Sequence, residues 1–179
     1  MSLDADLLND FFDESKNLIE ELVELLEDIE SDFSQVSKLN DFGNKIDRIM
    51  GTARSLAMMA EPDHGLNLIS DYTSLCKLVA YKGAENTDNP LFYDVTVALL
   101  LDATEALKIL IPQIELKVNQ LKRLISPQFI DRVKWISEML GKPTQYLKTS
   151  DSPKEVGVSS GANALGQSEI DDLLKKLGF

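Results

Sequence analysis

Apolar residues recur at helical spacing along most of this 179-residue chain, and the strict alternation typical of strands is nearly absent. In the first segment, apolar side chains return at steps of three, four and seven residues, with carboxylates on the other side: Leu8, Phe11, Phe12, Leu18, Ile19, Leu22, Leu26 and Ile29. This pattern predicts an amphipathic helix with a solvated acidic face. A chain built of such segments folds by burying its stripes against one another, so we expect an all-α fold.

Three more stripes predict helices at about 39–57, 66–79 and 91–111. Proline and glycine residues mark the breaks between these helices. Proline at position 62 disfavours helix at Glu61, a glycine-containing, turn-rich stretch begins at Gly83, and Pro112 ends or kinks the fourth segment. Short connections favour antiparallel neighbours, so residues 1–111 are expected to form an up-down helical bundle.

The charge of the chain is concentrated at one end. The formal net charge is −12, and residues 1–32 carry twelve carboxylates against one cation, Lys16, a balance of −11. Such a surface repels phosphate backbones and anionic lipid, so we expect no nucleic-acid partner. The apolar runs are far shorter than the roughly 20 residues of a membrane span, and no basic leader precedes one. We expect no membrane insertion and a cytoplasmic location.

Sulfur and imidazole chemistry is scarce. Cys76 is the one cysteine and His64 the one histidine, which excludes an internal disulfide, a Cys/His metal cluster and a nucleophilic triad. We therefore expect no metal site. Cys76 lies on an apolar stripe and is interpreted as a buried small hydrophobe, and His64 as an ordinary surface residue at a helix start.

Residues 112–148 are interpreted as a basic helical extension. Seven cations outnumber three carboxylates from Ile114 to Lys148, while apolar residues keep helical spacing. The opposite charge makes packing against the acidic first helix one alternative, and a solvated face the other. Bundle helices often pair between chains, which leaves a homodimer open.

Residues 149–167 contain no periodic stripe and are rich in Ser, Gly, Pro and Asn, which is typical of a flexible linker. Residues 168–179 then have the pattern of a short amphipathic helix. Ser168 and Asp171 fit a capping box, Lys175 and Lys176 suit the last turn, and Gly178 suits the helix end. So short a helix is marginal alone in water, so its stripe needs a covering surface, either its own bundle or another protein.

The terminal sequence DDLLKKLGF resembles the CheY-binding helix at the end of CheZ chemotaxis phosphatases, and GQSEIDDLL resembles the CheY-binding peptide of the flagellar switch protein FliM. The resemblance covers about twelve residues and implies a CheY-like response regulator as partner. It implies no cofactor in this chain and Mg²⁺ in the partner regulator. The implied contact residues are Ile170, Asp171, Asp172, Leu173, Leu174, Leu177 and Phe179.

A second resemblance covers roughly residues 4–111. The Phe-Phe-Asp-Glu cluster at 11–14 and the stretch Gly-Thr-Ala-Arg-Ser-Leu at 51–56 are similar to a four-helix histidine phosphotransfer domain of the kind that opens CheA kinases. Asp47 stands where the phospho-accepting histidine is expected, and Met50 where a lysine is expected. Aspartate cannot form the phosphoramidate, so the resemblance implies a docking scaffold without phosphorelay activity, with Arg48 and Arg54 beside Asp47 as partner contacts.

An enzymatic alternative is a CheZ-like phosphatase of phosphorylated CheY. The acid and amide stretch of CheZ is missing, but Asp41-Phe-Gly-Asn44 resembles the motif of CheC, CheX and FliY phosphatases. The resemblance implies that Asn44 orients water and that Asp41 or Asp47 pairs with the regulator's active-site lysine. Glu115 and Asn119 form a second helical acid and amide pair, and Asx residues at helix starts are also common caps.

Overall fold

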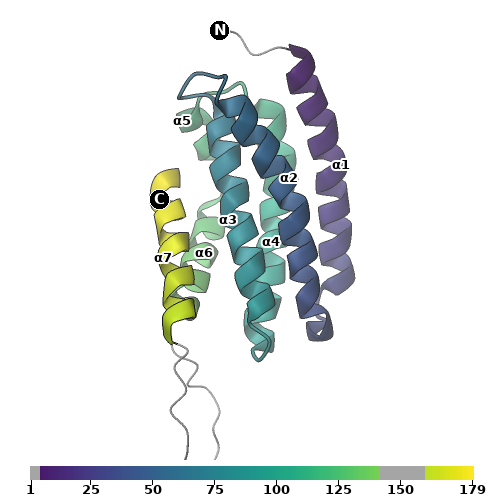
Figure 1. The fold of residues 1–179 in the computed structure, drawn as a ribbon, viewed down its shortest axis with the longest axis vertical. Helices are drawn as coiled ribbons and strands as arrows, with labels where there is room; N and C mark the ends of the chain where they lie inside the picture. Colours follow the sequence, from purple (N-terminus) through teal and green to yellow (C-terminus); the bar gives the residue numbers. More distant parts are fainter. Residues whose placement is uncertain (1–4, 142–159) are drawn as a thin grey trace, which may run out of the picture.

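The computed structural model describes residues 5–141 and 160–179, and these form seven α-helices and no strand. The long helices run alternately up and down (Figure 1). The expected all-α helical bundle is confirmed. The helices are α1 (Ala5–Ile29), α2 (Leu39–Ala57), α3 (Gly65–Glu85), α4 (Pro90–Leu110), α5 (Val118–Leu121), α6 (Pro127–Gly141) and α7 (Ser160–Leu177).

Helices α1 to α4 form a four-helix arrangement in which α2 packs on α3, α1 on α4, and each pair on the other. Their limits follow local chemistry. Asn89 caps α4 by accepting a hydrogen bond from the Phe92 backbone N–H, with Pro90 at the first position. At the other end α4 gives way to a 3₁₀ turn, Ile111–Gln113, that contains Pro112. Helix α2 has the limits that the apolar pattern predicts.

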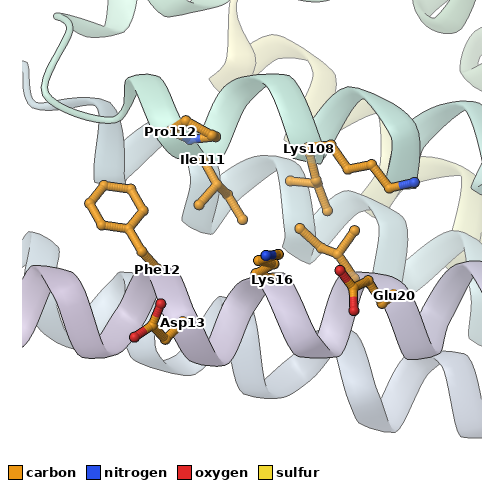
Figure 2. A pocket seen from close by; sticks show the side chains of 9 residues that line it. Phe12, Asp13, Lys16, Glu20, Lys108, Ile111 and Pro112 are labelled. Atoms are coloured by element: carbon orange, nitrogen blue, oxygen red, sulfur yellow. The ribbon is translucent and has the colours of Figure 1, made fainter.

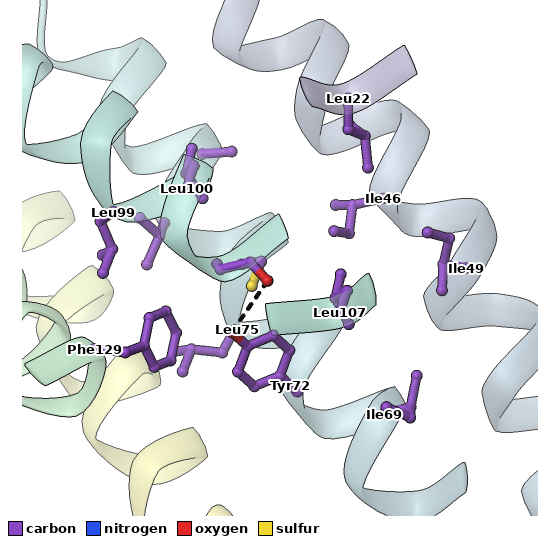
Figure 3. Packing of buried hydrophobic residues seen from close by; sticks show 14 of the residues in the cluster. Leu22, Ile46, Ile49, Ile69, Tyr72, Leu75, Leu99, Leu100, Leu107 and Phe129 are labelled. Carbon is purple, nitrogen blue, oxygen red and sulfur yellow. Dashed lines mark hydrogen bonds between the residues drawn. The ribbon is translucent and has the colours of Figure 1, made fainter. Parts of the chain in front are cut away.

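The centre of the core lies around α3 (Figure 3). The Tyr72 ring is fully buried and lies 5.1 Å, between ring centroids, from Phe129 of α6. Its hydroxyl donates a 3.2 Å hydrogen bond to the carbonyl of Ala103 on α4, which satisfies the polar end of a buried aromatic side chain. Helix α6 therefore shares one core with the four-helix arrangement.

The basic segment does not pack mainly on the acidic first helix. The principal neighbours of α6 are α4 and α7, and Arg132 of α6 pairs with Asp102 of α4. Upstream, Glu115 lies in a turn outside α5. The prediction that Glu115 and Asn119 share one helix face is therefore wrong. Lys117 instead pairs with Asp63 at 2.7 Å and fastens this segment to the connection before α3.

Helix α7 packs on α3 and α6 and begins at Ser160 (Figure 1). The predicted linker of residues 149–167 falls partly outside the described residues, and for residues 160–167 it is wrong because they are helical. Ser168 is an exposed residue within the helix, so the predicted cap at this position is also wrong. Gly166 is buried against the Lys82 side chain, and a Cβ there would lie 2.9 Å from Lys82 Cε.

The end of α7 is built as the sequence predicts. Gly178 adopts the left-handed conformation with φ of 80°. Its N–H bonds to the carbonyl of Lys175 at 2.9 Å, and the N–H of Phe179 bonds to the carbonyl of Leu174 at 2.9 Å. These two bonds are the Schellman arrangement that closes a helix.

Two predicted structural residues have the expected roles. His64 is the N-cap of α3, where Nδ1 accepts a 3.2 Å hydrogen bond from the Leu66 backbone N–H. Cys76 is 2% exposed within the core. None of the described helices has the length and apolar composition that a membrane span requires.

The buried thiol gives a first prediction. Burial raises the pKa of the Cys76 thiol well above its usual range, because the thiolate loses its hydration in the core. A thiol-reactive dye should therefore leave the native chain unlabelled at pH 7 and at pH 9, and should label it at once in guanidinium. Fast native labelling that increases with pH would contradict the core position.

Candidate partner-binding surface

The position expected to hold a phospho-accepting histidine is occupied by an ion pair. Asp47 of α2 is half-buried, and its Oδ1 accepts a 2.6 Å hydrogen bond from Nζ of Lys77 on α3. The resemblance to phosphotransfer domains predicts a lysine at position 50, and the structure instead has Lys77 of the neighbouring helix beside Asp47. Asp47 has no imidazole that could accept a phosphoryl group, and the charge of its carboxylate is largely balanced by Lys77.

The amide of Asn44 is held one turn earlier on α2. Asn44 is exposed, and its Oδ1 accepts a 2.9 Å hydrogen bond from the Tyr81 hydroxyl of α3. The neighbouring Gly43 is buried, and a Cβ built on it would overlap the Tyr81 ring. The glycine therefore lets Tyr81 lie close against α2, and this contact holds the Oδ1 side of the exposed Asn44 amide.

The other predicted residues of this face lie outward. Asp41 pairs with Lys38 at 3.5 Å, with half of its side chain exposed. Arg48 donates a 2.6 Å hydrogen bond to Glu14 of α1. Next to it, the hydrogen bond from Lys45 lowers the pKa of Glu21. Arg48 therefore takes part, with Lys45, in the ion pairs that join α2 to α1.

Arg54 borders a groove between α2, α3 and α7 of about 470 Å³. We call it the α2/α3/α7 groove. Two separately predicted contact sets, the face around Asp47 and the terminal peptide, meet here because α7 is packed beside α3. The lining residues are Met50, Arg54, Ser74, Lys77, Leu78, Tyr81, Glu169, Asp172 and Leu173.

The remaining predicted residues of α7 face the bundle. Ile170, Leu174 and Leu177 are 0%, 3% and 4% exposed. Asp171 accepts a 2.7 Å hydrogen bond from the Ser137 hydroxyl of α6. Phe179 is half-buried, with its ring centroid 4.4 Å from Nζ of Lys122, a cation–π contact.

Sequence reasoning missed the residues that hold these groups: Asp71, Lys77, Tyr81, Lys122 and Ser137. The spacing of Lys77 and Tyr81, one turn apart on α3, was the available signal that they share a helix face. Their partners lie on other helices, and a single helical pattern does not reveal which helix a face meets.

A second depression lies between α1 and α4 (Figure 2). Its volume is about 560 Å³, with buried Ile19, Leu107 and Ile111 beneath exposed Lys16 and Lys108. No residue predicted for partner binding or catalysis is among those that line it. The depression therefore stands apart from the candidate surface.

Metal chemistry has no support in residues 5–141 and 160–179, where no group of three or more His, Cys, Asp or Glu side chains is arranged to hold an ion. Comparison with known protein families, with characterised proteins and with solved structures finds no match to this chain. The candidate surface therefore rests on its own geometry.

The close approach at Gly43 gives the second prediction. Gly43→Ala should lower the free energy of unfolding by about 1 to 3 kcal/mol relative to Gly51→Ala, because the added methyl group must displace the Tyr81 ring. Gly51 is the matched control, since it lies on the same helix and a Cβ there meets nothing within 4 Å. The gain in helix propensity is the same for both, so urea unfolding isolates the contact. Equal stabilities would contradict it.

Proposed function

We propose that this chain is a chemotaxis or two-component signalling protein that binds a CheY-like response regulator through α7. The single observation that carries the proposal is the sequence of residues 166–179, GQSEIDDLLKKLGF, which resembles two kinds of CheY-binding peptide. These residues are helical to Leu177 and end in a Schellman arrangement. A short helix that can display one apolar stripe suits helix-in-groove recognition.

The strength of such a contact follows from its apolar side chains. Ile170, Leu174 and Leu177, with Leu173 and Phe179 beside them, contribute about 1.5 to 3 kcal/mol each when buried. Ordering and association oppose this by several kcal/mol, which leaves an affinity in the micromolar range for α7 when it is not packed on its own bundle. Micromolar binding suits a signalling contact that must form and dissociate. The Mg²⁺ expected in the complex belongs to the regulator.

The same proposal excludes a phosphorelay through α2. Asp47 replaces the imidazole that would carry the phosphoryl group, and its carboxylate is paired with Lys77. His64 does not substitute for it, since its ring caps α3 at the far end of the connection after α2. Phosphotransfer is therefore no part of the proposed function.

The third prediction tests the binding element. Leu174→Asp should weaken binding of a purified CheY-like receiver domain at least tenfold in a titration, because it places a carboxylate in the apolar stripe. The chain lacking residues 165–179 should not bind. Leu91→Asp is the control, since Leu91 is 64% exposed at the start of α4 and should leave affinity unchanged. If Leu174→Asp binds the receiver domain as tightly as the unmodified chain, the proposal is wrong.

A phosphatase of the phosphorylated regulator is the second candidate, favoured by the fixed but open amide of Asn44. The Tyr81 hydroxyl holds Oδ1 of the exposed Asn44 side chain, which leaves the NH₂ group as the donor that would orient water. Asp41 suits the role of partner to the regulator's lysine better than Asp47, because its ion pair with Lys38 is long, 3.5 Å, whereas Asp47 lies 2.6 Å from Lys77. Docking through α7 would raise the effective concentration of this face.

The fourth prediction separates the two candidates. If the chain is a phosphatase, it should accelerate loss of phosphate from the phosphorylated receiver domain, and Asn44→Ala should abolish at least nine-tenths of that acceleration. Tyr81→Phe should reduce it partly by releasing the amide. Asn119→Ala, an exposed amide on α5, is the control. Measurable binding without acceleration by the unmodified chain would leave only the binding function.

A further inference from the structure

We infer that α7 occupies two mutually exclusive sites, the surface of α3 and α6 in this chain and the regulator, so that regulator binding requires release of α7 from its own bundle. The inference rests on the proposed function and concerns the regulation of that site. It follows from an overlap, because all of the terminal-peptide residues proposed to contact the regulator except the exposed Asp172 also pack on or bond to the bundle.

The overlap is clearest for the apolar stripe. Ile170, Leu174 and Leu177 are at most 4% exposed, and Leu173 packs at the edge of the same core. The opposite side of the helix carries exposed charges, among them Glu169, Asp172 and Lys175. Recognition of an amphipathic helix needs its apolar side, so the docked helix offers a receiver domain the wrong side.

The polar contacts repeat the overlap along the helix. Asp171 is bound to Ser137 of α6 at 2.7 Å, and Lys176 is paired with Asp71 of α3 at 2.6 Å. At the end of α7, Lys122 donates to the Gly178 carbonyl and lies over the Phe179 ring. Three neighbouring segments thus hold α7, and none of these holding residues belongs to the terminal peptide.

The docked state sets how strongly a regulator binds. The apparent dissociation constant is the intrinsic one divided by the released fraction, so a released population of about one in a hundred weakens binding about a hundredfold. A change that loosens α7 without altering its sequence must therefore tighten regulator binding, and a covalent lock must prevent it.

The locking experiment uses Lys82→Cys with Gly166→Cys in the full chain, because neither position is among the proposed regulator contacts. A Cβ at position 166 would lie 3.5 Å from Cγ of Lys82, so cysteines at these two positions approach within the distance that a disulfide spans. Buried Cys76 does not compete in the native chain. The probe is a purified CheY-like receiver domain with Mg²⁺ and beryllium fluoride, titrated against the oxidised and reduced forms of the same protein, with disulfide formation verified by mass.

The reduced form should bind, and the oxidised form should bind at least tenfold more weakly. The loosening variant is Asp71→Asn, which removes the partner of Lys176 and should tighten binding about two- to fivefold, as expected for one partly exposed ion pair. Asp88→Asn, an exposed carboxylate in the connection before α4, is its control and should change nothing.

The outcomes distinguish the two ideas. Equal affinity of the oxidised and reduced forms, with binding by the unmodified chain, overturns the mutually exclusive sites and leaves the proposed function intact. No gain on Asp71→Asn, with binding retained by the oxidised form, overturns them in the same way. Absence of binding by every form, including Asp71→Asn, overturns the proposed function and with it the inference.

Discussion

The structure depends on the need to cover α3 on several sides. Its buried residues are not confined to one stripe, because Leu66, Leu68, Ile69, Tyr72 and Leu75 follow one another around the helix. A helix that is apolar on most of its circumference must lie inside a protein. Helices α2, α4 and α7 all pack on it, and α5 closes its first turn. The position of every other element near the candidate surface follows from this demand.

The demand on α3 also explains why the terminal helix lies where it does. Without α7, part of α3 and part of α6 would face solvent, and the apolar stripe of α7 would have no cover of its own. Packing the apolar stripe of α7 on α3 and α6 removes both apolar surfaces from solvent. The polar contacts at Ser137, Asp71 and Lys122 then fix the register of α7 on the bundle.

Much of this fold was predictable from the sequence because its signals are local. Helix α2 ends at Ala57, shortly before the break expected at Glu61-Pro62, and α7 ends just before Gly178, whose φ of 80° suits glycine. The start of α7 was not predictable, since residues 160–167 contain glycine and asparagine and carry no stripe. These residues extend the packed part of α7 toward its N-terminal end, and at Gly166 the absence of a side chain permits contact with Lys82.

The candidate site was also predictable only in part, because some of its features are local and others depend on how helices pack. The aspartate at position 47, where the resemblance to phosphotransfer domains predicts a histidine, and the pattern of Ile170, Leu174 and Leu177 are visible in the sequence. The pairing of Asp47 with Lys77, and of Asn44 with Tyr81, joins residues thirty or more positions apart and depends on how α2 meets α3. Helical periodicity gives the faces of each helix but not the partner of a face.

The placement of charge has a consequence for encounters in solution. The acidic α1 lies at one edge of the molecule, and α6 and α7 lie at the opposite edge (Figure 1). Separated in this way, the charge gives the molecule an electric dipole moment across the bundle. An anionic partner approaching through dilute buffer would be repelled most strongly at α1 and least at the α6 and α7 edge, and added salt would weaken this orientation by screening the field.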